Sequence, residues 1–223
     1  MVSQLCDRRL LPDSIVRAGI RQLLKQRLRE LSDAPHQSSG GCSADLLNEL
    51  QSGPIAVSTH AANEQHYEVP AEFFHQVLGG HLKYSCGYWQ DQQAPLTAEA
   101  LTAAEATALR QSCAHAELSD GQRVLELGCG WGSLSLWMAE HYPGSTITAV
   151  SNSHSQRAWI TTQAEQRQLA NLHVITADIN EFGTPDRFDR VVSVEMFEHC
   201  RNHRELMSRI AGWLQPEGKL FVH

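Results

Sequence analysis

Short apolar runs alternate with longer helical patterns along the second half of the chain. From residue 123 onward, each run rich in β-branched residues is followed by a segment whose apolar positions recur at helical spacing. Strands and helices that alternate in this way build a doubly wound, mostly parallel sheet, so we expect an α/β fold. The pattern predicts strands over residues 123–127, 146–150, 173–176, 188–194 and 219–222, and helices over 133–141, 155–169 and 201–214.

The N-terminal part of the chain shows helical segments separated by turn residues. Basic residues recur every fourth position from Arg17 to Arg29, which predicts a basic amphipathic helix over 12–31. Packing of this helix on the main domain is favoured over contact with a membrane surface, because its apolar face lacks Trp and Phe. The Ser- and Gly-rich residues 32–43 then indicate a flexible linker.

These patterns divide the chain into two parts. We expect an N-terminal helical region with its linker over residues 1–55 and a second domain over 56–223. Two further helices are expected before the first strand, one that begins near Pro70 and ends at Gly79-Gly80, and one over 97–118.

Composition excludes several classes of function. The formal net charge of -7 argues against general binding to nucleic acid, and no apolar run approaches the length of a membrane-spanning helix. The chain has 6 cysteines and no C-x-x-C pair, so we expect neither a metal site nor a disulfide framework. A cytoplasmic location fits this cysteine usage best.

The first predicted strand runs into a glycine-rich turn, Gly128-Cys-Gly-Trp-Gly132, that opens a helix. Open parallel sheets bind ligands at the carboxyl ends of their strands, and glycine lets a ligand approach the main chain there. The spacing differs from the G-x-G-x-x-G of dinucleotide folds. Glu126 precedes the turn and suits a ligand that carries an ammonium better than one that carries phosphates.

Four further motifs occur in order along the chain. They are A-A-N-E-Q-H-Y-E-V-P (61–70), L-K-Y-S-C-G-Y-W (82–89), S-N-S-H-S-Q (151–156) and S-V-E-M-F-E-H (193–199). With the glycine turn they resemble the coclaurine N-methyltransferase group of the cyclopropane-fatty-acid synthase family, from about Pro12 to the last residue. The resemblance implies a Rossmann-like class I methyltransferase that uses S-adenosylmethionine (SAM) and releases S-adenosylhomocysteine (SAH).

The resemblance also implies where SAM binds. Tyr84 and Ser85 should close over its methionine end, and hydroxyls are good partners for a carboxylate. Other residues that should contact SAM are Gly128 and Gly130 at the methionine and ribose, Asn152 and Gln156 at the ribose hydroxyls, Asp178 with Ile179 at the adenine, and Val194 beneath the ligand. Taken singly, Asp178 is better explained as a helix or loop cap, and Asn152 and Gln156 as turn or helix-surface residues. Their joint occurrence in register favours contact with SAM.

Glu195, Glu198 and His199 are the candidate catalytic residues, and helical spacing brings them to one side. An aliphatic amine is mostly protonated at neutral pH, so its methylation requires removal of a proton. The resemblance implies that Glu195 and His199 position and deprotonate the nitrogen of a small-molecule amine. The structural alternative is that Glu198 and His199 cap the following helix.

Two other functions stay open at this point. In the cyclopropane branch the counterparts of Cys86, Glu198 and His223 hold a bicarbonate, but those enzymes typically have Gly where this chain has Glu195. A carboxylate there suits a cationic amine and is costly beside an alkene chain. Sheets of this class normally have two strands after the fifth, which we expect to be missing here, so a non-catalytic SAM-binding fragment is the third candidate.

Overall fold

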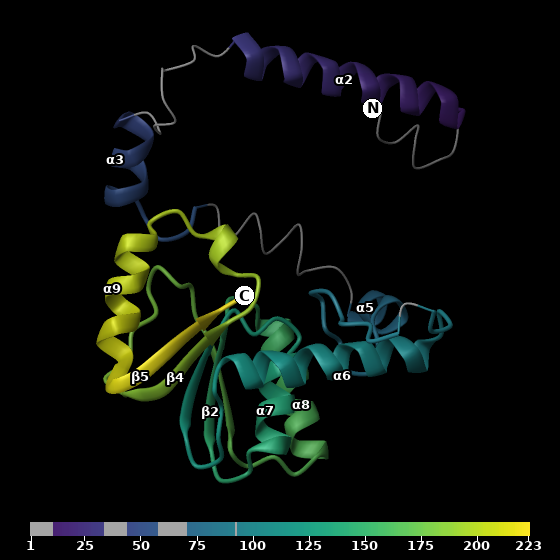
Figure 1. Cartoon of the computed structure of the whole chain (residues 1–223). Helices are drawn as coiled ribbons and strands as arrows, with labels where there is room; N and C mark the ends of the chain where they lie inside the picture. The colour runs from purple at the N-terminus through teal and green to yellow at the C-terminus, as the bar shows by residue number, and fades with distance from the viewer. Residues whose placement is uncertain (1–10, 34–43, 58–70, 92) are drawn as a thin grey trace. The chain divides into compact units, whose positions relative to one another are not determined.

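The computed structural model describes residues 11–33, 44–57, 71–91 and 93–223 (Figure 1). The chain divides into two compact units, Met1–Leu47 and Asn48–His223. The first contains helix α2 (Asp13–Asp33), which confirms the N-terminal helix, and α3 (Ala44–Ser52) spans the division. The boundary predicted at residue 55 stays a prediction, and the motif at 61–70 and residues 34–43 of the linker lie outside the described residues.

The second unit is built on a five-stranded parallel sheet, which confirms the predicted α/β fold. The strand order is β3-β2-β1-β4-β5, so the chain leaves β1 first to one side and then to the other. This reversal between β1 and β4 is the switch point at which such sheets bind ligands. The strands are β1 (Arg123–Leu127), β2 (Thr146–Ser151), β3 (Leu172–Thr176), β4 (Phe188–Ser193) and β5 (Leu214–Val222).

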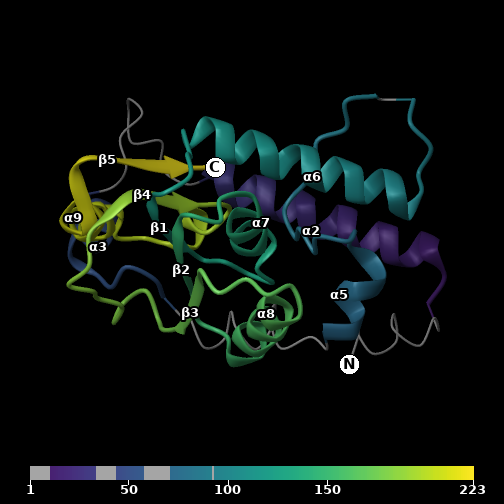
Figure 2. The same cartoon turned by 90° about the horizontal axis from the view of Figure 1, so that it is seen from below.

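Helices cover both faces of the sheet. Figure 2 shows α9 on one face and α6, α7 and α8 on the other. Their bounds are α5 (Ala71–Val77), α6 (Ala98–His115), α7 (Ser133–His141), α8 (His154–Gln166) and α9 (His203–Trp213), with a short 3-10 turn, η2, at Phe197–His199. No helix in the described part of the chain is long and apolar enough to cross a membrane.

The predicted start of the last strand is wrong. β5 begins at Leu214, directly after α9, and not at Lys219. The intervening residues include Pro216 and Gly218, which indicate a turn when the sequence is considered alone. In the structure Leu214 pairs with Phe188 of β4, and a shift in register between Phe188 and Arg190 accommodates the irregular stretch. Proline is tolerated in strands at such irregularities.

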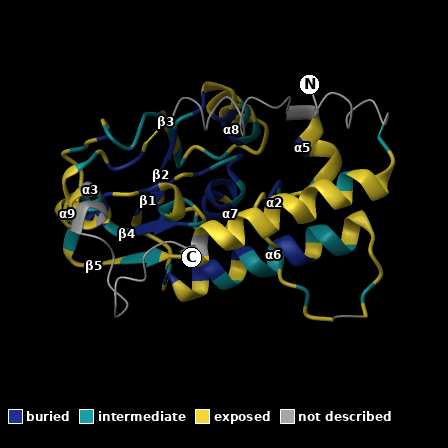
Figure 3. Ribbon diagram, turned by 90° about the horizontal axis from the view of Figure 1, so that it is seen from above, coloured by how far each residue is buried: buried dark blue, intermediate teal, exposed yellow. Residues whose placement is uncertain are grey.

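Alternate residues of β1 face different sides of the sheet. Leu125 and Leu127 join a cluster with residues of α9, whereas Val124 packs in a second cluster with residues of α6 and α7. Figure 3 shows the resulting band of buried residues along the central strands. Glu126 shares the face of Val124, so this carboxylate is directed toward α7 and not toward water.

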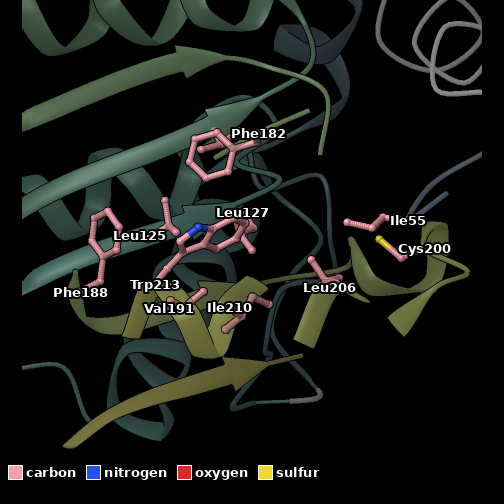
Figure 4. Close-up of a cluster of buried hydrophobic side chains, with 11 residues drawn as sticks. Ile55, Leu125, Leu127, Phe182, Phe188, Val191, Cys200, Leu206, Ile210 and Trp213 are labelled. Atoms are coloured by element: carbon pink, nitrogen blue, oxygen red, sulfur yellow. The ribbon is translucent and has the colours of Figure 1, made fainter. Parts of the chain in front are cut away.

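A segment that we call the strap, Gln51–Val57, attaches to the α9 side of the second unit. Its Ile55 is 2% exposed and packs in the cluster with Leu127, beside Cys200 (Figure 4). The buried Asn202 donates its side-chain amide to the carbonyls of Gln51 and Gly53, at 3.3 and 2.6 Å. The strap therefore belongs to the packed core of this unit.

Candidate functional site

Two adjoining cavities open at the carboxyl ends of the strands. The first measures about 880 Å³ with its open mouth and is lined by residues that follow β1, β2, β3 and β4. The second measures about 780 Å³ and extends toward the loop before α6 and the start of α7. Gly128, Gly130, Glu195 and His199 line both cavities, so the two form one continuous site.

All twelve residues predicted for the site line these cavities. Those that line only the first cavity are Asn152, Gln156, Asp178 and Ile179, and those that line only the second are Tyr84, Ser85, Val194 and Glu198. The remaining four are the residues shared by both cavities. The structure thus brings together residues from five segments of the chain, while their individual roles stay predictions.

The glycine-rich turn holds the main chain close to the cavities. The backbone N–H groups of Gly128 and Cys129 both donate to the carbonyl of Val150 at 3.0 Å, which ties the turn to the end of β2. Gly130 has a φ of 52°, and a Cβ placed there would meet no atom of the described residues within 4 Å. Gly130 therefore faces open space that a ligand can occupy.

Glu126 places a buried carboxyl group on the second cavity. Its side chain is 3% exposed and accepts a hydrogen bond from the hydroxyl of Ser135 in α7. Burial raises the pKa of Glu126 to about 7, and the bond from Ser135 opposes this only in part. No cation pairs with Glu126 in the described part of the chain. A ligand ammonium beside it would favour the ionised form.

Gln156 presents an unsatisfied donor at the first cavity. Its side chain is 2% exposed, and its Oε1 accepts a hydrogen bond of 2.7 Å from the hydroxyl of Ser151. Its buried Nε2 has no hydrogen-bond partner among the residues that the structure describes. A buried donor without a partner is costly, and a ligand acceptor in the cavity would remove the cost. The alternative explanation of Gln156 as a solvated helix-surface residue is wrong, because the side chain is buried at the cavity.

Asp178 does act as the loop cap that was one of its predicted roles. Its Oδ1 accepts hydrogen bonds from the backbone and side-chain amides of Asn180, at 2.8 and 2.9 Å. Asn180 in turn holds both the N–H and the carbonyl of Ala56 in the strap. Asp178 also lines the first cavity, so one side chain serves the loop, the strap and the cavity.

Glu195 follows β4 in a backbone conformation that is unusual for a residue other than glycine. Its φ is 50°, and its N–H donates to the carbonyl of His223 at 3.0 Å. Strain of this kind costs roughly 1–3 kcal/mol and tends to occur at functional sites. The backbone therefore holds Glu195 at the junction of the two cavities at a cost in stability.

Glu198 and His199 follow in η2 and do not cap the next helix. The N-cap of α9 is Asn202, whose side chain accepts from the N–H of Glu205 at 3.0 Å. The structural alternative for Glu198 and His199 is therefore wrong. Both side chains are exposed and line the second cavity, and their catalytic roles stay predictions.

The side chains of Cys86, Glu195 and His223 gather at the same place. One sulfur, one carboxylate oxygen and one ring nitrogen lie within 4.8 Å of one another. Cys86 and His223 are two of the three residues expected to surround a bicarbonate in the cyclopropane branch. In this chain the Glu195 carboxylate lies beside them. The expectation that no metal takes part stays a prediction.

The sequence prediction missed two buried charged residues that shape the second cavity. Lys83 lines it with 6% exposure and donates to the hydroxyl of Ser85 and, at 2.8 Å, to the carbonyl of Cys86. Glu105 in α6 is 1% exposed and accepts from the N–H groups of Gly79 and His81, which fixes the turn before Lys83. A glutamate within an alanine-rich helix and a lysine beside Tyr84 were the available signals.

Several known proteins resemble this chain over most of its length. The family model described as mycolic acid cyclopropane synthetase matches residues 56–223. The (S)-coclaurine N-methyltransferase of Thalictrum flavum subsp. glaucum is 36% identical over 213 residues, which cover 96% of this chain and 58% of that protein. The cyclopropane-fatty-acyl-phospholipid synthase of Escherichia coli (strain K12) is 31% identical and covers 72% of this chain and 39% of that protein.

A solved structure resembles most of the chain. The crystal structure of coclaurine N-methyltransferase bound to N-methylheliamine and SAH superposes with a TM-score of 0.79 at 31% identity. The match covers 98% of this chain and 62% of that one. The chain therefore spans less than two thirds of the length of these relatives.

Proposed function

The chain belongs to the mycolic acid cyclopropane synthetase family, and from that premise we propose that it is a SAM-dependent methyltransferase acting on the nitrogen of a small amine. Membership confirms the resemblance drawn from the motifs. The relatives named above methylate amines or modify phospholipid acyl chains, by their names. The choice between these two substrate classes depends on the residues around Glu195.

The lining of the two cavities fits SAM. The unpartnered Nε2 of Gln156 supplies a donor for the ribose, and the open space at Gly130 leaves room for the ligand against the main chain. The buried Glu126 provides a carboxylate for the methionine ammonium. Asn152, Asp178 and the other predicted contacts retain their proposed roles. Bound SAM supplies an electrophilic methyl group, and its sulfur leaves as the thioether of SAH.

The chain's own residues prepare the amine. Glu195 attracts the ammonium form to the junction of the cavities, and His199 on the same junction takes the proton. The freed lone pair then forms the new N–C bond as the S–C bond breaks. Glu198 lines the second cavity beside them and adds negative charge that favours a cationic substrate. Holding the nitrogen in line with the methyl group provides much of the rate enhancement.

The position of the Glu195 carboxylate is the observation that carries this proposal. It lies with Cys86 and His223, within 4.8 Å, where the cyclopropane reaction would need a bicarbonate. A carboxylate fixed to the chain beside those groups repels a second anion, and it is costly next to an alkene. An amine that arrives as a cation is instead attracted by the Glu195 carboxylate. The site therefore favours an amine over a lipid acyl chain.

Labelled SAM distinguishes the three candidate functions. We would incubate the chain with methyl-labelled SAM and, in parallel, a panel of small secondary amines that includes (S)-coclaurine and heliamine, or vesicles of unsaturated phospholipid. We expect label in the amine. Label in the lipid would overturn the amine proposal in favour of cyclopropane chemistry. Label in neither, with SAH bound, would favour the non-catalytic binding fragment.

Substitution of Glu195 gives the sharper prediction. Glu195→Gln keeps the shape of the side chain but removes the charge that attracts and helps deprotonate the amine. We expect amine methylation to fall by roughly 100-fold or more. SAH affinity, measured by calorimetry, should stay within about threefold of the wild type. Unchanged turnover would remove Glu195 from the mechanism. The cytoplasmic location stays a prediction.

A further inference from the structure

Lys83 is a buried cation on the wall of the second cavity. It follows the turn held by Glu105, and its side chain is only 6% exposed. Its ammonium donates to the hydroxyl of Ser85 and to the carbonyl of Cys86. Both acceptors are neutral, and an ammonium has three donors. Among the described residues, one donor and the full positive charge of Lys83 therefore have no partner.

No carboxylate in the described part of the chain pairs with Lys83 within 4.0 Å. The two carboxylates that act on it from a greater distance are Glu195 and Glu105, and both oxygens of Glu105 are already occupied by the backbone. Burial lowers the pKa of Lys83, which reflects the cost of holding its charge away from water. An unpaired buried cation is unfavourable unless an anion from outside the chain forms an ion pair with it.

The same cavity carries a buried acid without a cation. Glu126 and Lys83 both line it, and neither has an ionic partner among the described residues. A ligand that carries an ammonium and a carboxylate on one carbon matches this pair of opposite charges. The methionine half of SAM is such a zwitterion.

We propose that Lys83 binds the α-carboxylate of the methionine half of SAM, with the Ser85 hydroxyl as its neighbour. The inference rests on the proposed function and deepens it by assigning a residue that the motifs did not. Ser85 accepts from Lys83, so its own hydrogen is available to the same carboxylate. The competing explanation is that Lys83 only stabilises the loop that contains Ser85 and Cys86. Its two hydrogen bonds to that loop are sufficient for such a role and require no ligand.

A pair of ligands that differ only in the carboxylate separates these explanations. We would measure by calorimetry the affinities of SAH and of its decarboxylated form, S-adenosyl-3-thiopropylamine, for the full chain and for Lys83→Met and Lys83→Arg. Lys83→Met preserves the length of the side chain and removes the charge, whereas Lys83→Arg retains a cation. Thermal unfolding of each variant reports any damage to the fold.

We expect Lys83→Met to lose about tenfold or more in SAH affinity, because hydrogen bonds to charged groups are strong. Its affinity for the decarboxylated ligand should be unchanged, and Lys83→Arg should bind SAH nearly as well as the wild type. Equal losses for both ligands, or no loss for SAH, would overturn the assignment of Lys83 alone. Failure of the wild-type chain to bind SAH would overturn the proposed cofactor and this inference with it.

Discussion

Glu126 makes the stability of the fold depend on pH in an unusual direction. Its carboxyl has a pKa near 4.5 when exposed and about 7 in the folded chain, because burial disfavours the charge. Between these values the folded state keeps a proton that the unfolded state has lost. We therefore expect this group to stabilise the fold fully below pH 4.5, and the contribution, on the order of 3 kcal/mol, to be lost as pH rises to 7.

Urea unfolding of the wild type and of Glu126→Gln at several pH values between 5 and 8 measures this contribution. The difference in unfolding free energy between the two should fall up to about pH 7 and be level above it. Glu126→Gln is the matched control because it keeps an acceptor for Ser135 and cannot ionise. Excess SAH should flatten the slope, since its ammonium lowers the pKa of the carboxyl. A slope that SAH does not alter would contradict contact between the two groups.

At the scale of the element, the turn between β1 and α7 contains one glycine that faces the cavities and one that packs against α8. Gly130 and Gly132 both have positive φ, 52° and 79°. A Cβ at Gly130 would enter open cavity space, but one at Gly132 would lie 2.5 Å from Cγ1 of the fully buried Ile160 in α8. The same substitution should therefore damage binding at one position and folding at the other.

We expect Gly130→Ala to cost about 1–2 kcal/mol in stability from its backbone alone. Its SAH affinity should fall about tenfold or more, because the methyl group occupies ligand space. Gly132→Ala also displaces the Ile160 side chain, so we expect this variant to lose roughly 2–5 kcal/mol of stability. Urea unfolding and calorimetry on each folded variant check both effects. Equal destabilisation by the two variants would contradict the different surroundings of the two glycines.

The strands, the parallel sheet and the glycine turn after the first strand could be predicted because each depends on a local pattern. Alternating apolar residues and a glycine turn after Leu127 are visible within a few positions of one another. The buried charges could not be predicted in the same way. Whether Lys83 and Glu105 are buried depends on segments about twenty residues apart folding against each other, and no periodicity encodes that contact. The early start of β5 depends likewise on pairing with Phe188.

The candidate site shows the same division. The motifs predicted twelve residues that line the two cavities. This was possible because the carboxyl ends of parallel strands meet at one edge of the sheet. Ala56 and Val57 also line the first cavity, but nothing in their own sequence marks them. They reach it because Asn180 holds the backbone of Ala56, and Ala56 forms an isolated antiparallel bridge with Cys200. A contact made through backbone atoms does not require a particular residue type, so the sequence of the strap does not predict it.

At the scale of the whole molecule, removal of the N-terminal region should preserve the fold only if the strap stays intact. A domain boundary at residue 55 would cut through it, because Ile55 is part of the core and its carbonyl accepts from the N–H of Arg201 at 2.6 Å. A cut after residue 47 follows the division between the two compact units and leaves the strap whole. The two truncations differ by only a few residues and should behave differently.

We expect residues 48–223 to fold and to bind SAH with an affinity within about threefold of the full chain. The fragment 56–223 lacks the buried Ile55 side chain, which should lower its unfolding free energy by roughly 2–5 kcal/mol. It also leaves the Asn202 amide without its acceptors, which should lower that free energy by roughly 1–3 kcal/mol more. Such a loss is a large share of the 5–15 kcal/mol that stabilises a typical domain. Thermal unfolding and calorimetry of both fragments test this, with Ile55→Ala in the full chain as the control for side-chain burial alone. If both fragments melt and bind alike, the strap is not part of the fold, and the boundary predicted at residue 55 would be the better one.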